Sequence, residues 1–463
     1  MTVRTAGLSG EWRALLTLCG PLALVQLCQM AMTAISTAVL GHLGSVALAG
    51  GGLGAAIGAA LVLVAQGVVA GLQPFAAQNA RAAERAQILV AALLVALACS
   101  VPVALALLNV SHVLALFGMP PAVAQAALDY CTACAWGAPF ALCVASLRYF
   151  LVAVRRTHAV MAIAAGATLC NGVLSWMLAY GKWGASVSGV RGAGMAWSLT
   201  WAAMLVALAG YAIRVRLCPL ALIAPLPDAR RAVMERIRGV LRVGWPIAVG
   251  YASEIWLFLL FSTMVARFGT ASLSAHQLAL NLVNAAFMVP LALAQTATLR
   301  VAQHWGGGLR QDAARAAALA LAAGAAYAGV CAALLMAFPD AVVRLFVERT
   351  DARYVAIDEQ ANALFALGAL YIGCDALQAI AAGALRGMQK TRTPMLIVVC
   401  GYWGLGLPLA WALSRWITPA VVGIWTGIAL AASCVAALML RLLWRSEIFQ
   451  QTRPRALGTR ITR

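Results

Sequence analysis

The sequence predicts an all-α membrane protein of about twelve transmembrane helices in two pseudo-symmetric six-helix lobes. Composition is the first reason: of 463 residues, 63% are hydrophobic and 10% are charged, whereas soluble domains average about 45–50% apolar and about 25% charged residues. Apolar runs of about 20 residues, each enough to cross a bilayer as a helix, recur along the whole chain. Short alternating segments typical of membrane strands do not appear. The third reason is an internal repeat.

The apolar runs place the helices in order along the chain. We expect spans near residues 12–38, 46–72, 88–110, 122–147, 159–180, 193–213, 243–266, 271–299, 314–338, 357–385, 394–415 and 419–440. The basic start of the first run resembles a signal peptide. Its apolar stretch is longer than the usual ~7–15 residues and has no clear small-residue cleavage motif. We therefore interpret it as a retained first helix.

The repeat relates the two halves of the chain. Residues 41–79 align without a gap to residues 266–304, which pairs Gly44 with Gly269 and Gln78 with Gln303. Further matches between the two halves follow in the same order, for example Leu147-Arg148 with Leu385-Arg386. Each match alone is weak, but together they indicate a duplicated six-helix unit. Because six is an even number, both copies have the same orientation, and transporters often place their substrate path between such repeats.

The repeat also sets the expected domain limits. We place an N-terminal lobe at 1–213, an inter-lobe linker at 214–242, a C-terminal lobe at 243–445 and a basic tail at 446–463. The end of the linker reads DARRAVMERIRGVLR, in which apolar residues recur at helical spacing beside arginines. Such a segment is typical of a helix that lies on an anionic membrane surface.

The net charge of +19 is explained by topology. With the N-terminus inside, 26 of the 33 Lys and Arg residues fall in the inner loops and ends, and seven in the outer loops. This is the positive-inside pattern. It favours cytoplasmic positions for both ends of the chain over nucleic-acid binding.

Two acids inside the predicted spans are the candidate functional residues. Glu254 and Asp375 lie well within apolar runs of the second half. A carboxylate at the centre of a membrane helix costs roughly 2.5–3.5 kcal/mol on insertion scales, and burial favours its protonated form. We therefore expect an inward-facing, hydrated site that exchanges a proton or holds a cation. Tyr371 lies four residues before Asp375, on the same helix face.

A polar stripe follows on the next predicted helix. Gln277, Asn281 and Asn284 fall on one side of that helix, and they either line a cavity or bind neighbouring helices together. His276 has the same two alternatives. The first half nearly lacks such a polar interior. His304 lies at the end of a predicted span, where we expect an interfacial position.

The cysteines point to packing. Most of the twelve lie inside apolar runs, where cysteine behaves as a small hydrophobe. Cys131 and Cys134 form a lone CxxC pair without a second pair to complete a zinc site.

Four motifs resemble those of the MATE (multidrug and toxic compound extrusion) transporters. They are STAVLGHLGSVALA at 36–49, GVRGAGMAW at 189–197, ARFGTASLSAHQL at 266–278 and GALRGMQKTRTPM at 383–395. The contexts of Glu254, Tyr371 and Asp375 are similar to the NorM-like bacterial branch. The resemblance implies two six-helix lobes around a V-shaped cavity, and export of cationic, lipophilic compounds against inward flow of Na⁺ or H⁺.

The resemblance also assigns roles to residues. It implies that Glu254 and Asp375 bind the coupling cation, as Na⁺ ligands if coupling is to sodium, with Tyr371 nearby. Gln277 and Phe287 match cavity-lining positions, and Pro21 matches a proline at which the first helix bends. Ser36 stands where the family usually has an acid, so coupling should fall on Glu254 and Asp375.

The expected function is therefore multidrug efflux by antiport in the bacterial inner membrane. We expect small organic cations and membrane lipid as partners, a monomer, and no cofactor beyond the coupling ion. The alternative is a flippase for lipid-linked saccharides, which shares the broad architecture. Its cavity should hold basic residues, and these are nearly absent from the predicted spans. An enzyme is not expected, because neither paired aspartates nor HExxH occurs.

Overall fold

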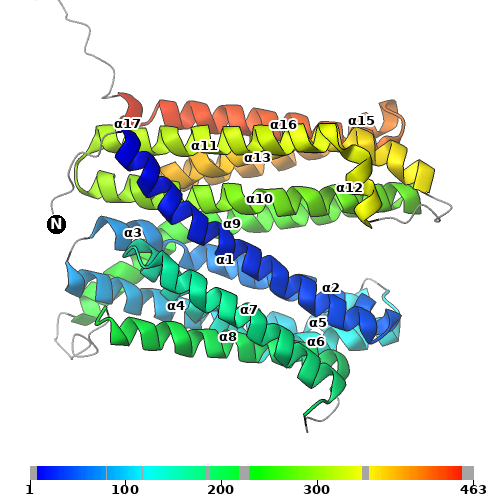
Figure 1. The fold of residues 1–463 in the computed structure, drawn as a ribbon, viewed down its shortest axis with the longest axis horizontal. Coiled ribbons are helices and arrows are strands. Elements are labelled where there is room, and N and C mark those ends of the chain that lie inside the picture. Colours follow the sequence, from blue (N-terminus) through cyan, green and yellow to red (C-terminus); the bar gives the residue numbers. More distant parts are fainter. Residues whose placement is uncertain are drawn as a thin grey trace, which may run out of the picture. The chain divides into compact units, whose positions relative to one another are not determined.

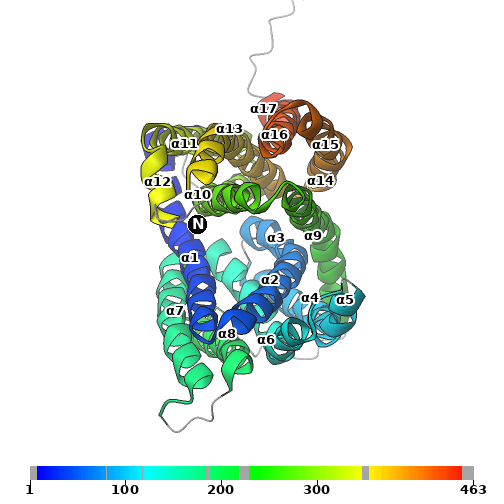
Figure 2. The same ribbon diagram turned by 90° about the vertical axis from the view of Figure 1, so that its right-hand side faces the viewer.

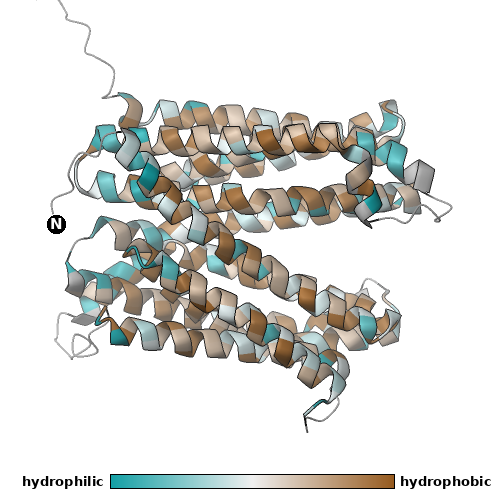
Figure 3. Ribbon diagram, in the orientation of Figure 1, coloured by the Kyte–Doolittle hydropathy of each residue, from teal (hydrophilic) through white to brown (hydrophobic). Residues whose placement is uncertain are grey.

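The computed structural model describes residues 8–79, 81–116, 118–183, 188–217, 229–346 and 354–450. These ranges form helices and contain no strand. Twelve helical segments among them are long and apolar enough to cross a membrane, which confirms the predicted fold class. Apolar residues dominate the middle of these helices and hydrophilic residues gather toward their ends (Figure 3).

The helices follow the order of the predicted spans (Figure 1). The first half comprises α1 (Leu8–His42), α2 (Ser45–Val69), α3 (Leu72–Gln78), α4 (Ala82–Leu108), α5 (Val110–Leu116), α6 (Pro121–Ala153), α7 (Thr157–Tyr180) and α8 (Gly189–Arg214). The second half comprises α9 (Ala229–Ala266), α10 (Thr270–Gly306), α11 (Arg310–Ala337), α12 (Pro339–Phe346), α13 (Tyr354–Gly387), α14 (Arg392–Val399), the π-helical turn η2 (Cys400–Gly406), α15 (Leu407–Trp416), α16 (Ala420–Trp444) and α17 (Glu447–Gln450). Helices α2 and α3 together form one span, as do α14, η2 and α15.

The repeat appears in the backbone as well as in the sequence. Gly44 and Gly269 immediately precede α2 and α10, with φ angles of +116° and +101°. Side chains disfavour this region, so glycine is the residue suited to both positions. The two equivalent glycines therefore begin equivalent helices.

The chain divides into two compact units that exchange the starts of two helices. The N-terminal unit comprises Gly20–Trp256, and the C-terminal unit comprises Met1–Cys19 with Leu257–Arg463. The start of α1 therefore belongs to the C-terminal unit, and most of α9 belongs to the N-terminal unit. The lobe, linker and tail limits expected from the repeat stay predictions, and residues 218–228 and 451–463 lie outside the described ranges.

Helix α6 is the centre of the N-terminal unit. It packs against α2, α4 and α8, and nearly all of its residues from Tyr130 onward are buried. Small residues permit this approach: Gly54 lies against the α6 backbone at Ala127, and Gly194 lies against Tyr130. The thiols of Cys131 and Cys134 donate to the carbonyls of Gly54 and Gly194, at 3.5 and 3.9 Å. The CxxC pair thus contributes to helix packing.

Helix α13 holds the same position in the C-terminal unit. It packs against α10, α11 and α16, and the end-on view of Figure 2 shows it beside these three helices. Gly383 lies against the α10 backbone at Ala294, and the Thr298 hydroxyl donates to the Gly383 carbonyl at 2.9 Å.

The short helix α17 is attached to the C-terminal unit by surface ion pairs. Lys390 donates to the Glu447 carboxylate at 2.7 Å, and Arg310 lies 3.6 Å from its second oxygen. The Lys390 hydrogen bond and charge lower the pKa of Glu447. Because this carboxylate is exposed, we expect little stabilisation from the pair.

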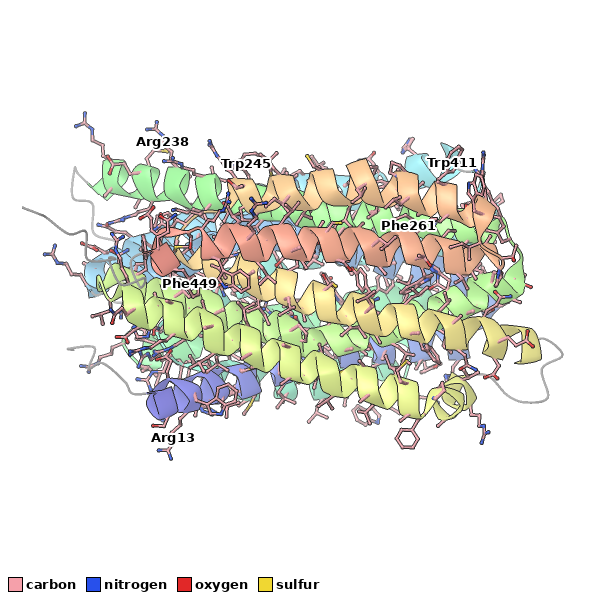
Figure 4. All side chains as sticks on the ribbon, turned by 90° about the horizontal axis from the view of Figure 1, so that it is seen from above. Arg13, Arg238, Trp245, Phe261, Trp411 and Phe449 are labelled. Carbon is pink, nitrogen blue, oxygen red and sulfur yellow. The ribbon has the colours of Figure 1, made fainter. Side chains whose placement is uncertain are left out.

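The basic stretch before the seventh span does not form the separate surface helix that the sequence predicted. It forms the first turns of α9, which continues without interruption from Ala229 to Ala266. Further along, α9 makes close contacts with α2 and with Gly71 before α3 that involve glycines on both sides, notably Gly67, Gly71 and Gly244. Figure 4 shows Arg238 and Trp245 of this segment pointing away from the helix.

Candidate functional site

Asp375 lies in the interior of the C-terminal unit, one helical turn after Tyr371 on α13. Asp375 is 9% exposed and Tyr371 is 4% exposed. The Tyr371 ring meets the ring of Phe258 on α9 edge to face, with centroids 5.9 Å apart and planes at 85°. This geometry is favourable for aromatic rings. Tyr371 and Asp375, four residues apart, lie on the same face of α13.

Glu254 lies on α9, one helical turn before Phe258. It is half-buried and belongs to the N-terminal unit. Each of the two predicted acids therefore lies one turn from a member of the Phe258–Tyr371 pair on its own helix.

The next turn of α13 carries a polar pair that the sequence reading missed. Gln378 is buried, and the Tyr402 hydroxyl donates to its Oε1 at 3.0 Å. Tyr402 belongs to η2, and such π-helical turns occur frequently at functional sites. The signal available in the sequence was the spacing of three between Asp375 and Gln378, which puts both on one face of the helix.

Of the two alternatives for His276, lining a cavity or binding helices together, the structure supports the second. It is fully buried, and its Nδ1 accepts the indole N–H of Trp425 at 3.0 Å. Because an indole only donates, Nε2 carries the proton and donates to the Ser262 hydroxyl at 3.0 Å, which in turn donates to the Phe258 carbonyl. Both ring nitrogens are thus used in holding α10, α16 and α9 together.

A leucine at position 276 should destabilise the protein without removing transport. The change leaves the Trp425 N–H without an acceptor and the Ser262 hydroxyl without a donor, and an unpartnered buried group costs about 1–3 kcal/mol. We expect His276→Leu to unfold at lower temperature in detergent and to retain efflux per folded molecule. A variant of normal thermal stability that has lost efflux would instead place His276 in the transport site.

The predicted polar stripe of α10 points away from the packed interior of the C-terminal unit. Gln277, Asn281 and Asn284 are exposed, and Phe287 is half-buried. The face of α10 that contains Val283 is buried. The amides therefore lie on an accessible face, where they do not bind the helices of this unit together.

The N-terminal unit contains buried polar groups, so the expectation that the first half nearly lacks them is wrong. Ser36 is 3% exposed. Asn171 donates to the Thr200 hydroxyl at 3.2 Å, while the Asn171 Oδ1 and the Ser175 hydroxyl have no partner. A few hydroxyl and amide side chains do not interrupt an apolar run, so the mean hydropathy of the run does not indicate that they are there. Pro21 is buried within α1.

A buried ion cluster was also missed. Glu11 and His304 are both buried and lie beside Arg300, although we expected an interfacial position for His304. In the described part of the chain, no group of three or more His, Cys, Asp or Glu side chains is arranged to hold a metal ion.

Twelve apolar helices with carboxylates and amides placed inside them define a multi-pass α-helical membrane protein. Residues 21–177 and 246–412 match the MatE family. The chain is 33% identical to the multidrug resistance protein NorM of Burkholderia vietnamiensis, over 93% of this chain and 92% of that one. It is 34% identical to the probable multidrug resistance protein NorM of Pseudomonas putida, over 94% and 95%. The chain belongs to the MatE family.

Solved structures show the same fold. The eukaryotic MATE transporter AtDTX14 superposes with a TM-score of 0.83 at 20% identity, covering 96% of this chain and 98% of that one. An outward-facing multidrug resistance MATE family transporter of the MOP superfamily gives a TM-score of 0.83 at 18% identity, covering 96% and 97%.

Proposed function

We propose that this protein is a multidrug exporter that exchanges cationic, lipophilic compounds for inward Na⁺ or H⁺. The family membership and the relatives named as multidrug resistance proteins support export. The single observation that supports the coupling site is that the Asp375 side chain is buried, one helical turn from the buried Tyr371 on α13.

The proposed chemistry is competition for negative charge. Asp375 and Glu254 bind the coupling cation or proton, and the positive drug binds when that occupant leaves. A carboxylate in a medium of low dielectric constant is costly to leave charged without a cation, so each acid exchanges one positive occupant for another. The coupling is reciprocal: the factor by which the bound ion lowers drug affinity equals the factor by which the bound drug lowers ion affinity.

The accessible face of α10 is the proposed substrate surface. Gln277, Asn281 and Asn284 offer amide groups, and Phe287 offers an aromatic face to which an organic cation is attracted. Exposure of the three amides supports this assignment.

The first half contributes differently. We assign Ser36, a buried residue of the N-terminal unit, to the substrate cavity as well, and because a hydroxyl does not titrate near neutral pH, it supplies no proton site. Pro21 lacks a backbone N–H, so the α1 backbone is less constrained there, and we assign it the bend of this helix.

We place the protein in the bacterial cytoplasmic membrane with both ends inside. The distribution of Lys and Arg supports this orientation. Aromatic side chains at helix ends suit the membrane interface: Trp411 on α15 points outward (Figure 4) and is 53% exposed, with Arg415 3.8 Å from its ring centroid.

Dye transport in inverted membrane vesicles tests the proposed function. We expect ethidium to accumulate inside when an outward-directed gradient of either Na⁺ or H⁺ is imposed, and the effective gradient identifies the coupling ion. Failure of both gradients to drive ethidium, with the protein present in the vesicles, would refute the exchange.

A further inference from the structure

The two units hold the starts of α1 and α9 by different means. Residues 8–19 of α1 belong to the C-terminal unit, which otherwise begins at Leu257. Residues 229–256 of α9 belong to the N-terminal unit. The first helix of each repeat therefore begins on the unit built by the other repeat, and each start needs its own contacts there.

Close backbone packing holds the start of α9. A Cβ atom at Gly244 would overlap the carbonyl oxygen of Val68, and one at Gly71 would overlap the carbonyl oxygen of Val240. A Cβ atom at Gly67 would lie 2.8 Å from the Ala248 Cα. These contacts depend on shape and contain no charge, so protonation or ions do not alter them.

A buried ion cluster holds the start of α1. The Arg300 Nε donates to the Glu11 Oε1 at 2.8 Å, and the Arg300 Nη2 donates to Oε2 of the same carboxylate. The His304 Nε2 lies 3.3 Å from that oxygen. The side chains of Glu11, Arg300 and His304 are 4%, 6% and 1% exposed. Arg13, two residues further along α1, instead points away from the helix (Figure 4).

Both oxygens of Glu11 and three nitrogens of Arg300 have partners in the cluster, whereas the buried His304 Nδ1 has none. Arg300 also donates to Gln303 at 3.1 Å, so three of its nitrogens have partners. A bidentate guanidinium–carboxylate pair fixes orientation as well as distance. Removal of one partner leaves a buried charge uncompensated, so the attachment of α1 depends on all the charges being present.

We propose that Glu11, Arg300 and His304 are positioning residues for transport, which hold the first turns of α1 on the C-terminal unit. This inference rests on the proposed function. The cluster fixes the first turns of α1 within the C-terminal unit, whereas the rest of α1 belongs to the other unit. The start of α9 is held by glycine contacts without charge, so the charge-dependent attachment is that of α1.

The test compares Glu11→Gln with Glu11→Asp and the wild type in the full-length protein, in lipid nanodiscs and in vesicles. In Glu11→Gln we expect amide hydrogen exchange in residues 9–19 to become at least about ten-fold faster, because the Arg300 charge loses its partner. We expect ethidium transport to lose maximal rate with an unchanged KM, and Glu11→Asp, which keeps the charge, to recover part of that rate. Glu447→Gln, which removes an exposed carboxylate from the same unit, is the matched control and should match wild type in both measurements.

The proposal would be overturned if residues 9–19 of Glu11→Gln showed the same amide hydrogen-exchange rates as the wild type. It would also be overturned if their hydrogen exchange were faster while the ethidium transport rate equalled that of the wild type. If Glu11→Gln does not fold, His304→Gln removes the imidazole alone, and the same two measurements decide. A wild-type protein that transports no ethidium refutes the proposed function, whereas the exchange comparison still tests the attachment of α1.

Discussion

Asp375→Asn is expected to reduce ion-driven ethidium efflux to the level of cells without the transporter. Asparagine has almost the same shape as aspartate, so we expect the packing of α13 around this position to be retained. It cannot ionise, however, and an uncharged position neither attracts a cationic drug nor releases a proton. We expect the same loss in Glu254→Gln. The measurement is ethidium efflux from cells that lack their own exporters, with the membrane content of each variant determined alongside.

Glu84→Gln is the matched control for these amide substitutions. Glu84 lies in the first turn of α4, where it pairs with the exposed Arg81 at 3.6 Å. It is not part of the proposed site, so its variant should retain efflux. Unaltered efflux in both Asp375→Asn and Glu254→Gln would refute the assignment of the coupling acids.

Gly244→Ala is expected to have the largest effect on folding. Its Cβ would overlap the Val68 carbonyl oxygen, which is backbone and cannot move aside as a flexible side chain does. Overpacking of this kind costs about 1–3 kcal/mol and occasionally more. We expect a lower unfolding temperature in detergent and less protein in the membrane.

Gly250→Ala separates the loss of glycine from the overlap. Gly250 lies on the same helix, and its Cβ would meet nothing within 4 Å. Alanine is favoured over glycine in a helix by about 0.5–1 kcal/mol, so this variant should be as stable as the wild type or slightly more stable. Equal unfolding temperatures for the two variants would contradict the close packing of α9.

The helices could be predicted from the sequence because a bilayer imposes a long apolar run on every span. The exceptions are segments whose neighbours, and not the bilayer, determine the structure. The start of α9 is too charged to be recognised as part of a span, yet the helix begins at Ala229 and packs closely against α2 from residue 240 onward. Glu11 falls one residue before the predicted first span, so its burial beside Arg300 was not expected.

The candidate site could be predicted where chemistry is unusual for its surroundings. A carboxylate in an apolar run, such as Asp375, can be recognised from the sequence alone. The partners of such a group cannot: Tyr402 reaches Gln378 through a π-helical turn that no periodicity indicates. His276 was ambiguous because its role depends on Trp425, a residue 149 positions away.

Equilibrium binding of ethidium to the purified protein tests the exchange most directly. We predict that raising the Na⁺ concentration, or lowering pH, weakens ethidium binding to the wild type, and that Asp375→Asn removes this dependence. Ethidium that binds the wild type with one affinity across the whole range of Na⁺ concentration and pH would contradict competition at the carboxylates.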